Sequence, residues 1–234
     1  MTYRKGAVAA TALAVALVAI GVLWSRRGVE SAARATTTLH VPRATSDVKL
    51  DGETSEVAWR AAARTGPFTT SDGVMARPHA EARLVWRGQI LYLSLYAADR
   101  DIRSQGGGTD GPAWLADHFH LVFTLENGDE RVIDLSPSGD ITDGKRPRGS
   151  AAVDYRWGSD TKVATDADGT INDSSDEDEE WSLEVAIPLS SLQLRGRPSE
   201  SIGFSVRHCD VPPKGPRACG SFGEGPVGVR LVLD

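Results

Sequence analysis

An acidic stretch, DADGTINDSSDEDEE, has the oxygen-bearing side chains that calcium prefers as ligands. An EF-hand loop needs ligands at its positions 1, 3, 5 and 12 and a glycine at position 6. When Asp166, Asp168 and Gly169 take positions 3, 5 and 6, Ala164 and Ser175 take positions 1 and 12, so both ends of the pattern fail. We interpret Asp168-Gly169 as a hairpin turn followed by a solvated acidic loop, and structural calcium held in another way stays open as a cofactor.

Two histidines at a spacing of two residues could bind a transition metal. His118 and His120 lie on an expected strand, where alternate residues share a face, and His208 could supply a further ligand. Two histidines on the polar face of a sheet are the commoner arrangement, so we assign no metal site to them.

The two cysteines, Cys209 and Cys219, flank a segment rich in proline and glycine. The C-x-x-C spacing of redox and haem-attachment motifs is absent from the sequence. In an exported protein such a pair is most simply a disulfide, and closing this short loop stabilises the fold by about 2 to 3 kcal/mol. We therefore predict a Cys209–Cys219 disulfide.

The sequence lacks the common motifs of catalysis. It has no G-x-S-x-G, H-E-x-x-H or P-loop pattern, and its acids are too numerous for a glycosidase pair to be chosen by spacing. The first 35 residues carry five bases and one acid, and the rest of the chain carries 21 bases and 31 acids. Because no catalytic motif is present, we do not expect an enzyme. Because the negative body of the chain would repel a phosphate backbone, we do not expect nucleic acid as a partner.

An apolar segment near the N-terminus, Gly6 to Trp24, has 19 uncharged residues between basic flanks. A bilayer-spanning helix needs about 20 residues, whereas the core of a signal peptide has roughly 7 to 15. Residues 1–27 are therefore predicted to form a hydrophobic helix that is a signal anchor, with a cleaved signal peptide as the alternative. Residues 28–38 would be a linker, and the large domain would lie in the periplasm or be extracellular, attached to the membrane through this segment.

From about residue 39 onward, apolar residues alternate with polar ones as they do in half-buried strands. The alternating runs are Leu91–Leu95, Phe119–Leu125, Trp181–Ile187, Ile202–Val206 and Val229–Leu233. Turn patterns such as WRGQ, ENGDE and SPSGD separate the runs, and only TSEVAWRAAA and PLSSL look helical. We predict an all-β fold, an antiparallel Ig-like β-sandwich over residues 39–234.

Five sequence segments together resemble a known family of domains. They are VKLDGETSEVAWRAAA, EARLVWRGQILYLSLYAADRDI, DHFHLVFTLENGDERVIDLSPSGDITD, GTINDSSDEDEEWSLEVAIPLSSL and SIGFSVRHCD. Their order and rough spacing resemble the carbohydrate-binding module family 9 domains over nearly all of residues 41–210. The resemblance implies an Ig-like sandwich that binds carbohydrate, has no catalysis of its own and sometimes holds structural calcium.

A sugar site of this kind needs aromatic rings that stack on the apolar face of the sugar and polar groups that bond its hydroxyls. Trp59, Trp86 and Trp181 follow the periodicity of core residues, so we assign them to the core. Trp114 and Trp157 lie in irregular segments instead, and we predict that they stack on a neutral sugar. The predicted sugar-binding residues are Trp114, Trp157, Tyr155, Phe222, Arg131 and Arg156.

Two other functions stay open from the sequence. Related sandwich domains of the DOMON type hold haem b for electron transfer, and Met75 and His79 are the candidate axial ligands here. The domain could instead be an adhesion or scaffold module of the cell envelope without a small ligand.

Overall fold

The computed structural model of the protein describes residues 37–106, 111–224 and 228–234. All of them fall within one compact unit, Ala35–Asp234. The predicted N-terminal hydrophobic helix and nearly all of the predicted linker lie outside the described residues. Among the described residues, no helix has the length and apolar character needed to cross a bilayer.

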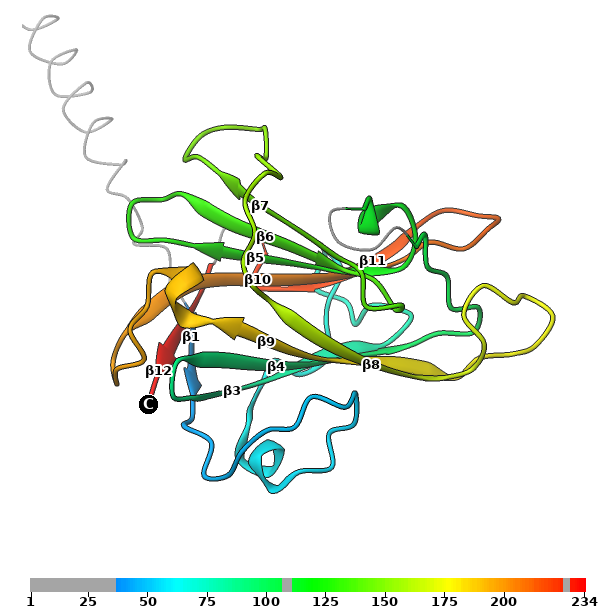
Figure 1. The fold of residues 1–234 in the computed structure, drawn as a ribbon. Helices are drawn as coiled ribbons and strands as arrows, with labels where there is room; N and C mark the ends of the chain where they lie inside the picture. Colours follow the sequence, from blue (N-terminus) through cyan, green and yellow to red (C-terminus); the bar gives the residue numbers. More distant parts are fainter. Residues whose placement is uncertain (1–36, 107–110, 225–227) are drawn as a thin grey trace, which may run out of the picture. The chain divides into compact units, whose positions relative to one another are not determined.

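Two β-sheets build the described domain, and each brings together strands that are distant in the sequence (Figure 1). The larger sheet has the order β1 (Thr37–Val41), β12 (Val229–Leu233), β10 (Ser201–Asp210), β5 (His118–Thr124), β6 (Glu130–Leu135), β7 (Ile141–Arg146), with β11 (Ala218–Phe222) paired to β10. The smaller sheet has the order β2 (Ala63–Arg64), β3 (Ala80–Arg87), β4 (Ile90–Ala98), β9 (Glu180–Pro188), β8 (Lys162–Asp168). The predicted all-β class is confirmed.

Alternating apolar residues form the main core between the sheets. Phe119 and Leu121 of β5 face inward toward Trp181 of β9 and Trp86 of β3, which belong to the same buried cluster. Trp59 belongs to a second, smaller cluster, and its Nε1 donates a hydrogen bond of 2.8 Å to a carboxylate of β9. All three tryptophans that we assigned to the core are at most 2% exposed, so that prediction is confirmed.

The two segments predicted as helical are single 3₁₀ turns. TSEVAWRAAA contains η1 (Val57–Ala61), and PLSSL contains η3 (Leu189–Leu192). Both segments are short, and a first helical turn fixes several residues for one hydrogen bond, so they do not extend into α-helices. A third 3₁₀ turn, η2 (Ala113–Leu115), precedes β5.

The predicted antiparallel arrangement needs one correction at the chain ends. Strand β1 pairs with β12 in parallel, with Thr37 opposite Val229, while the other strand pairs of the two described sheets are antiparallel. The sandwich also begins at Thr37, two residues earlier than predicted. Thr37 and Thr38 pair with β12, so they belong to the sheet and not to the expected linker.

The predicted hairpin turn at Asp168-Gly169 is a longer connection. Strand β8 ends at Asp168, which lies opposite Glu180, so residues 169–179 join the two strands. Within this loop, Asp178 accepts hydrogen bonds from the backbone amides of Thr170 and Ile102. These bonds satisfy backbone donors of two segments at once and hold the loop in its longer path.

The predicted disulfide between Cys209 and Cys219 is present. The two residues are direct partners across the antiparallel pair of β10 and β11. The bond therefore ties the short strand β11 to the longest strand of the larger sheet.

Candidate functional site

A groove on the outer face of the larger sheet is the strongest candidate for a ligand site. Because Phe119, Leu121 and Phe123 of β5 face the core, the residues between them face outward. The groove has a volume of about 600 Å³. Its polar lining includes His120 and Thr124 of β5, Glu130 of β6, Arg146 of β7, and Ser205 and Arg207 of β10.

Three of the four basic side chains of the groove pair with a neighbouring carboxylate, whereas Arg230 donates a hydrogen bond to Ser201 Oγ. The pairs are His120–Asp134 at 2.7 Å, Arg207–Glu224 at 3.1 Å and Arg146–Glu130. Such paired charges offer hydrogen-bond donors and acceptors side by side while their net charge stays small. This chemistry suits hydroxyl groups better than a strongly charged ligand.

A pair of stacked aromatic rings lies on the same outer face. Trp114 of η2 and Tyr155 of the β7–β8 connection have ring centroids 5.4 Å apart and an interplanar angle of 28°. Arg217 Nη2 donates a hydrogen bond of 2.9 Å to the carbonyl oxygen of Trp114. Tyr155 is 37% exposed and Trp114 is partly exposed, so ring surface of the pair is open to solvent.

Local backbone contacts hold Tyr155 against strand β7. Asp154 and Lys145 exchange two backbone hydrogen bonds, of 2.8 and 3.1 Å. These bonds place Tyr155, the residue after Asp154, over Gly144. A Cβ atom on Gly144 would lie 2.4 Å from Val153 Cγ1 and 3.2 Å from Tyr155 Cδ1. Glycine at this position therefore permits the close approach of the loop to the sheet.

The aromatic pair stands beside the polar floor of the groove. Burial raises the pKa of the Tyr155 hydroxyl, the Asp134 carboxylate raises it further, and Arg146 lowers it. Asp134 and Arg146 both belong to the ion pairs of the groove. Tyr155 also lies over Gly144, which shares its face of β7 with the groove residue Arg146 two positions further on.

Trp157 lies on the opposite side of the larger sheet, although only one residue separates it from Tyr155. Its ring contacts Arg131 and Lys145, and each cation lies 5.1 Å from the ring centroid. Arg131 and Lys145 are partners across β6 and β7, on the face that points toward the other sheet. The chain passes around edge strand β7 between the two aromatic residues, so the structure does not bring Trp157 together with Trp114.

The remaining residues of the predicted sugar site lie apart from the stacked pair. Phe222 lies opposite the core residue Val206 and packs against the main core. Arg131 is buried against Trp157, as described above. Arg156 is exposed and donates hydrogen bonds of 2.7 and 2.9 Å to the Asp154 carboxylate.

The three histidines considered for a metal do not share one face. His118 is buried, and its Nδ1 lies 2.7 Å from the carbonyl oxygen of Ala116. His208 points into the core, where its ring lies 5.0 Å from that of Phe119 and 5.7 Å from that of Trp181. Burial lowers the pKa of His208 to about 3, so this residue is neutral in the folded domain.

The two candidate haem ligands occupy different surroundings. Met75 is 49% exposed and forms an isolated bridge with Thr69. His79 contacts the ring of Tyr96 at 5.9 Å and lines a pocket rich in acidic residues, whose described lining does not include Met75.

Two groups of acids in the described part of the chain could hold a metal ion. One consists of Asp51, Glu56 and Glu184, and the other of Asp99, Asp117 and Asp210. Neither group includes a residue of the acidic stretch that first suggested calcium. The second group lies at an end of the sandwich, away from the groove lining described above.

Sequence reasoning missed the polar floor of the groove. Its residues come from five strands, β5, β6, β7, β10 and β12, which are far apart in the sequence. The outward positions of β5, β6 and β10 are the signal that could have identified them, provided the neighbouring strands were known.

The domain resembles solved structures of carbohydrate-binding proteins. Neither a protein-family model nor a curated protein matches the sequence. A provisionally assigned carbohydrate-binding protein from Bacteroides uniformis matches with a TM-score of 0.62 and 13% identity, over 86% of this chain and 100% of that one. A family 9 carbohydrate-binding module from Caldicellulosiruptor kristjanssonii, solved with cellotriose, matches with a TM-score of 0.61 and 14% identity, over 85% of this chain and 94% of that one.

A family 9 module from the same organism, solved with glucose, gives a TM-score of 0.59 and 14% identity, over 85% of this chain and 96% of that one. At such low identity the likeness concerns the fold alone. The described domain therefore has the fold of carbohydrate-binding module family 9.

Proposed function

We propose that the domain is a non-catalytic carbohydrate-binding module that binds a neutral sugar on the outer face of its larger sheet. The observation that carries the proposal is the partly exposed Trp114–Tyr155 stack beside a groove of paired charges. Structures with the same fold have been solved with glucose and with cellotriose, which supports sugar as the ligand class.

The aromatic pair and the groove would divide the recognition between them. An exposed ring surface can stack on the apolar C–H face of a sugar ring. The side chains of His120, Arg146 and Arg207 would donate hydrogen bonds to hydroxyls, and Glu130 and Glu224 would accept them. Since each of these groups already has a charged partner, a hydroxyl can share the hydrogen bonds without leaving a buried charge unpaired.

Replacing the two aromatic residues tests this proposal. We expect Trp114→Ala and Tyr155→Ala each to weaken sugar binding roughly tenfold, because one stacked ring contributes about 1 to 2 kcal/mol. Calorimetric titration of the purified full chain with glucose and cellotriose measures the change. Because residues 6–24 are apolar, the full chain is kept in detergent. The detergent is zwitterionic, since the sugar headgroups of glucosides and maltosides would compete with the ligand.

Trp157→Ala is the matched control, since Trp157 lies on the other side of the same sheet. Its affinity for sugar should equal that of the unmodified chain. Unchanged affinity in both Trp114→Ala and Tyr155→Ala would contradict the proposed site, and indifference of the unmodified chain to all sugars would favour a scaffold module.

We also propose that the domain lies outside the cytoplasm, attached to the membrane through its N-terminal segment. The apolar run from Gly6 to Trp24 supports export, and a disulfide between the two cysteines of the chain fits an oxidising compartment. Protease added to cells whose outer membrane face is accessible should digest the domain. Complete protection of the domain under these conditions would contradict the proposed location.

A further inference from the structure

A row of polar residues crosses the outer face of the larger sheet from strand to strand. In the register of the ladders, Asp134 of β6 lies opposite His120 of β5, and His120 lies opposite Arg207 of β10. Arg207 lies opposite Ser221 of β11, and Ser221 forms an isolated bridge with Thr69, outside the named strands. Neighbouring strands are about 4.8 Å apart, so the row is about 19 Å long. The groove contains only its middle part, at His120 and Arg207.

The row continues beyond the groove into a second hollow of the surface. This second hollow has a volume of about 880 Å³, and its lining includes Thr69 and Ser221 of the row. It shares three lining residues, Arg207, Gly223 and Glu224, with the groove. The two hollows are therefore neighbours, and they meet at the ion pair of Arg207 and Glu224.

The ion pair between the two hollows is accessible to a ligand. The side chains of Arg207 and Glu224 are 41% and 33% exposed, and Arg207 Nε lies 3.1 Å from the Glu224 carboxylate. Within the described part of the chain, the two Nη groups of Arg207 form no hydrogen bond. A guanidinium has five N–H donors, so donors remain for a ligand that lies across the pair. Because both charges are already paired, such a ligand would not leave a lone charge beneath it.

The second hollow has the chemistry of a site for a neutral ligand with many hydroxyl groups. Apart from the shared ion pair, its described lining has no charged side chain. The hydroxyl groups of Thr69, Ser71 and Ser221 belong to the lining and form no hydrogen bond within the described residues. Each of them can donate one hydrogen bond and accept others. Pro67 and Phe222 add apolar surface, and Phe222 is one of the predicted sugar-binding residues.

The far wall of the second hollow is fixed to the sheet by backbone contacts. Thr69 and Ser221 exchange two backbone hydrogen bonds, of 3.0 and 2.8 Å. A Cβ atom on Gly220 would lie 2.2 Å from the Cβ atom of Ala76 and 3.3 Å from that of Phe68, so residues 68–76 pack directly against β11. The second hollow is thus a preformed part of the fold, and a ligand would not have to order its walls.

We propose that the ligand is a chain of several neutral sugar rings, which runs across the strands from the Trp114–Tyr155 stack, over the Arg207–Glu224 pair, into the second hollow. This inference rests on the proposed sugar site and extends it. One ring of an extended sugar chain is about as long as the spacing between neighbouring strands, so the row offers a polar partner to each of about five successive rings. A single sugar or a short oligosaccharide would occupy the groove and leave the second hollow empty.

The test compares cellotriose with cellohexaose by calorimetric titration of the purified full chain in zwitterionic detergent. Cellohexaose should bind at least tenfold more tightly, because only the longer chain reaches from the stack to the second hollow. A hexasaccharide can also place three rings in the groove in more than one register, but these extra placements raise the affinity only a few-fold.

Two variants block the second hollow without altering the groove. Ser221→Tyr fills it from β11, and Ser71→Tyr fills it from an exposed position on the opposite wall, where no strand pairing is disturbed. Each should lower the affinity for cellohexaose to that for cellotriose, and each should leave the affinity for cellotriose unchanged.

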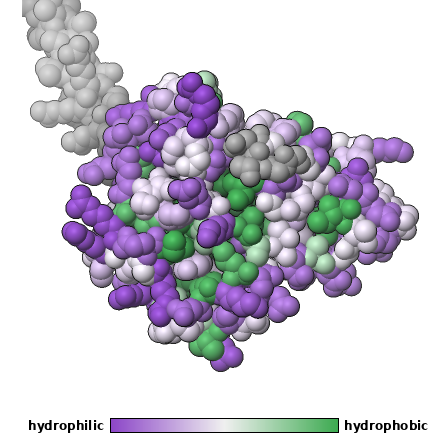
Figure 2. All heavy atoms as spheres, in the orientation of Figure 1, coloured by the Kyte–Doolittle hydropathy of each residue, from purple (hydrophilic) through white to green (hydrophobic). Residues whose placement is uncertain are grey.

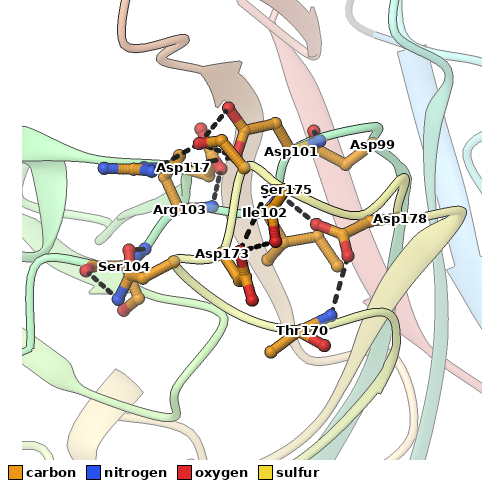
Figure 3. A network of polar contacts seen from close by, with 12 residues as sticks. Asp99, Asp101, Ile102, Arg103, Ser104, Asp117, Thr170, Asp173, Ser175 and Asp178 are labelled. Carbon is orange, nitrogen blue, oxygen red and sulfur yellow. Dashed lines mark hydrogen bonds and ion pairs between the residues drawn. The ribbon is translucent and has the colours of Figure 1, made fainter.

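Ser175→Tyr is the matched control, because it makes the same change at an exposed serine that lines neither hollow. Ser175 bonds to Asp173 in the connection between β8 and β9, within the polar network that Figure 3 shows. This variant should bind both oligosaccharides as the unmodified chain does.

The outcomes separate this inference from the proposed function. If cellohexaose binds less than tenfold more tightly than cellotriose, the extended site is wrong, while the sugar site itself stands if Trp114→Ala weakens the binding of both. If cellohexaose binds more tightly but neither Ser221→Tyr nor Ser71→Tyr removes the difference, the extra rings lie elsewhere and the inference is overturned. If neither oligosaccharide binds, the proposed function and this inference are both wrong.

Discussion

At the scale of single residues, the tryptophans divide into those that stabilise the core and those that lie near the surface. Trp181 has its ring 5.0 Å from Phe119 and 5.7 Å from His208, and it is 1% exposed. Trp114 is partly exposed and contacts Tyr155 instead. The same residue type therefore has two roles, and substitution separates them.

We expect Trp181→Ala to lower the free energy of unfolding by about 3 to 5 kcal/mol, because the deletion leaves a cavity between the sheets. Trp114→Ala should change it by less than about 1 kcal/mol, since no core contact is lost. Urea unfolding of both variants, followed by circular dichroism, gives the two values. Equal losses of stability would show that Trp114 is a core residue as well.

Helix or strand periodicity was enough to assign Trp59, Trp86 and Trp181 to buried positions. It could not show that Tyr155 and Trp157 lie on opposite sides of a sheet, because the path of a loop around an edge strand leaves no periodic pattern. Nor could it show that Trp114 stacks on Tyr155, since a contact between two loops depends on the strands that carry them.

At the scale of elements, the hairpin of β10 and β11 depends on the bond between Cys209 and Cys219. Among the named strands β11 pairs with β10 alone, and beyond them it is held by two backbone hydrogen bonds between Ser221 and Thr69. The disulfide reduces the freedom of the unfolded chain around this hairpin.

Replacing both cysteines by serine should lower the free energy of unfolding by about 2 to 3 kcal/mol, from the entropy of a closed loop of this length. Guanidinium unfolding of the double variant measures the loss. Thiol labelling of the unmodified chain, unfolded but not reduced, should find no free cysteine. Stoichiometric labelling of both cysteines would contradict the disulfide.

The sequence predicted the central strands well because each has a long apolar face, as in β4, β5 and β9. The parallel pair of β1 and β12 was not predictable in the same way, because pairing between chain ends is decided by the finished sheet. The 169–179 connection likewise depends on Asp178 reaching the amide of Ile102, a contact across more than 70 positions of the chain.

At the scale of the whole molecule, the groove on the outer face of the larger sheet gathers its polar residues from five strands. The groove needs β12, β10, β5, β6 and β7 side by side, and the chain reaches this order only by passing between the two sheets. Figure 2 shows that polar residues cover most of one side of the domain, with apolar residues gathered toward the middle of the view. The residue types in the sequence were therefore enough to suggest a sugar site. Its position could be found only once the order of the strands in the sheet was known.

The most direct test of the proposed sugar site is an NMR titration of the ¹⁵N-labelled full chain with cellotriose, observing the indole N–H signals of the six tryptophans. Single Trp→Phe variants assign the signals. The account predicts that the Trp114 signal moves in a saturable way, while the signals of Trp59, Trp157 and Trp181 stay in place. If cellotriose shifts the Trp157 signal and leaves the Trp114 signal unchanged, the ligand binds on the other side of the sheet, which would contradict the account.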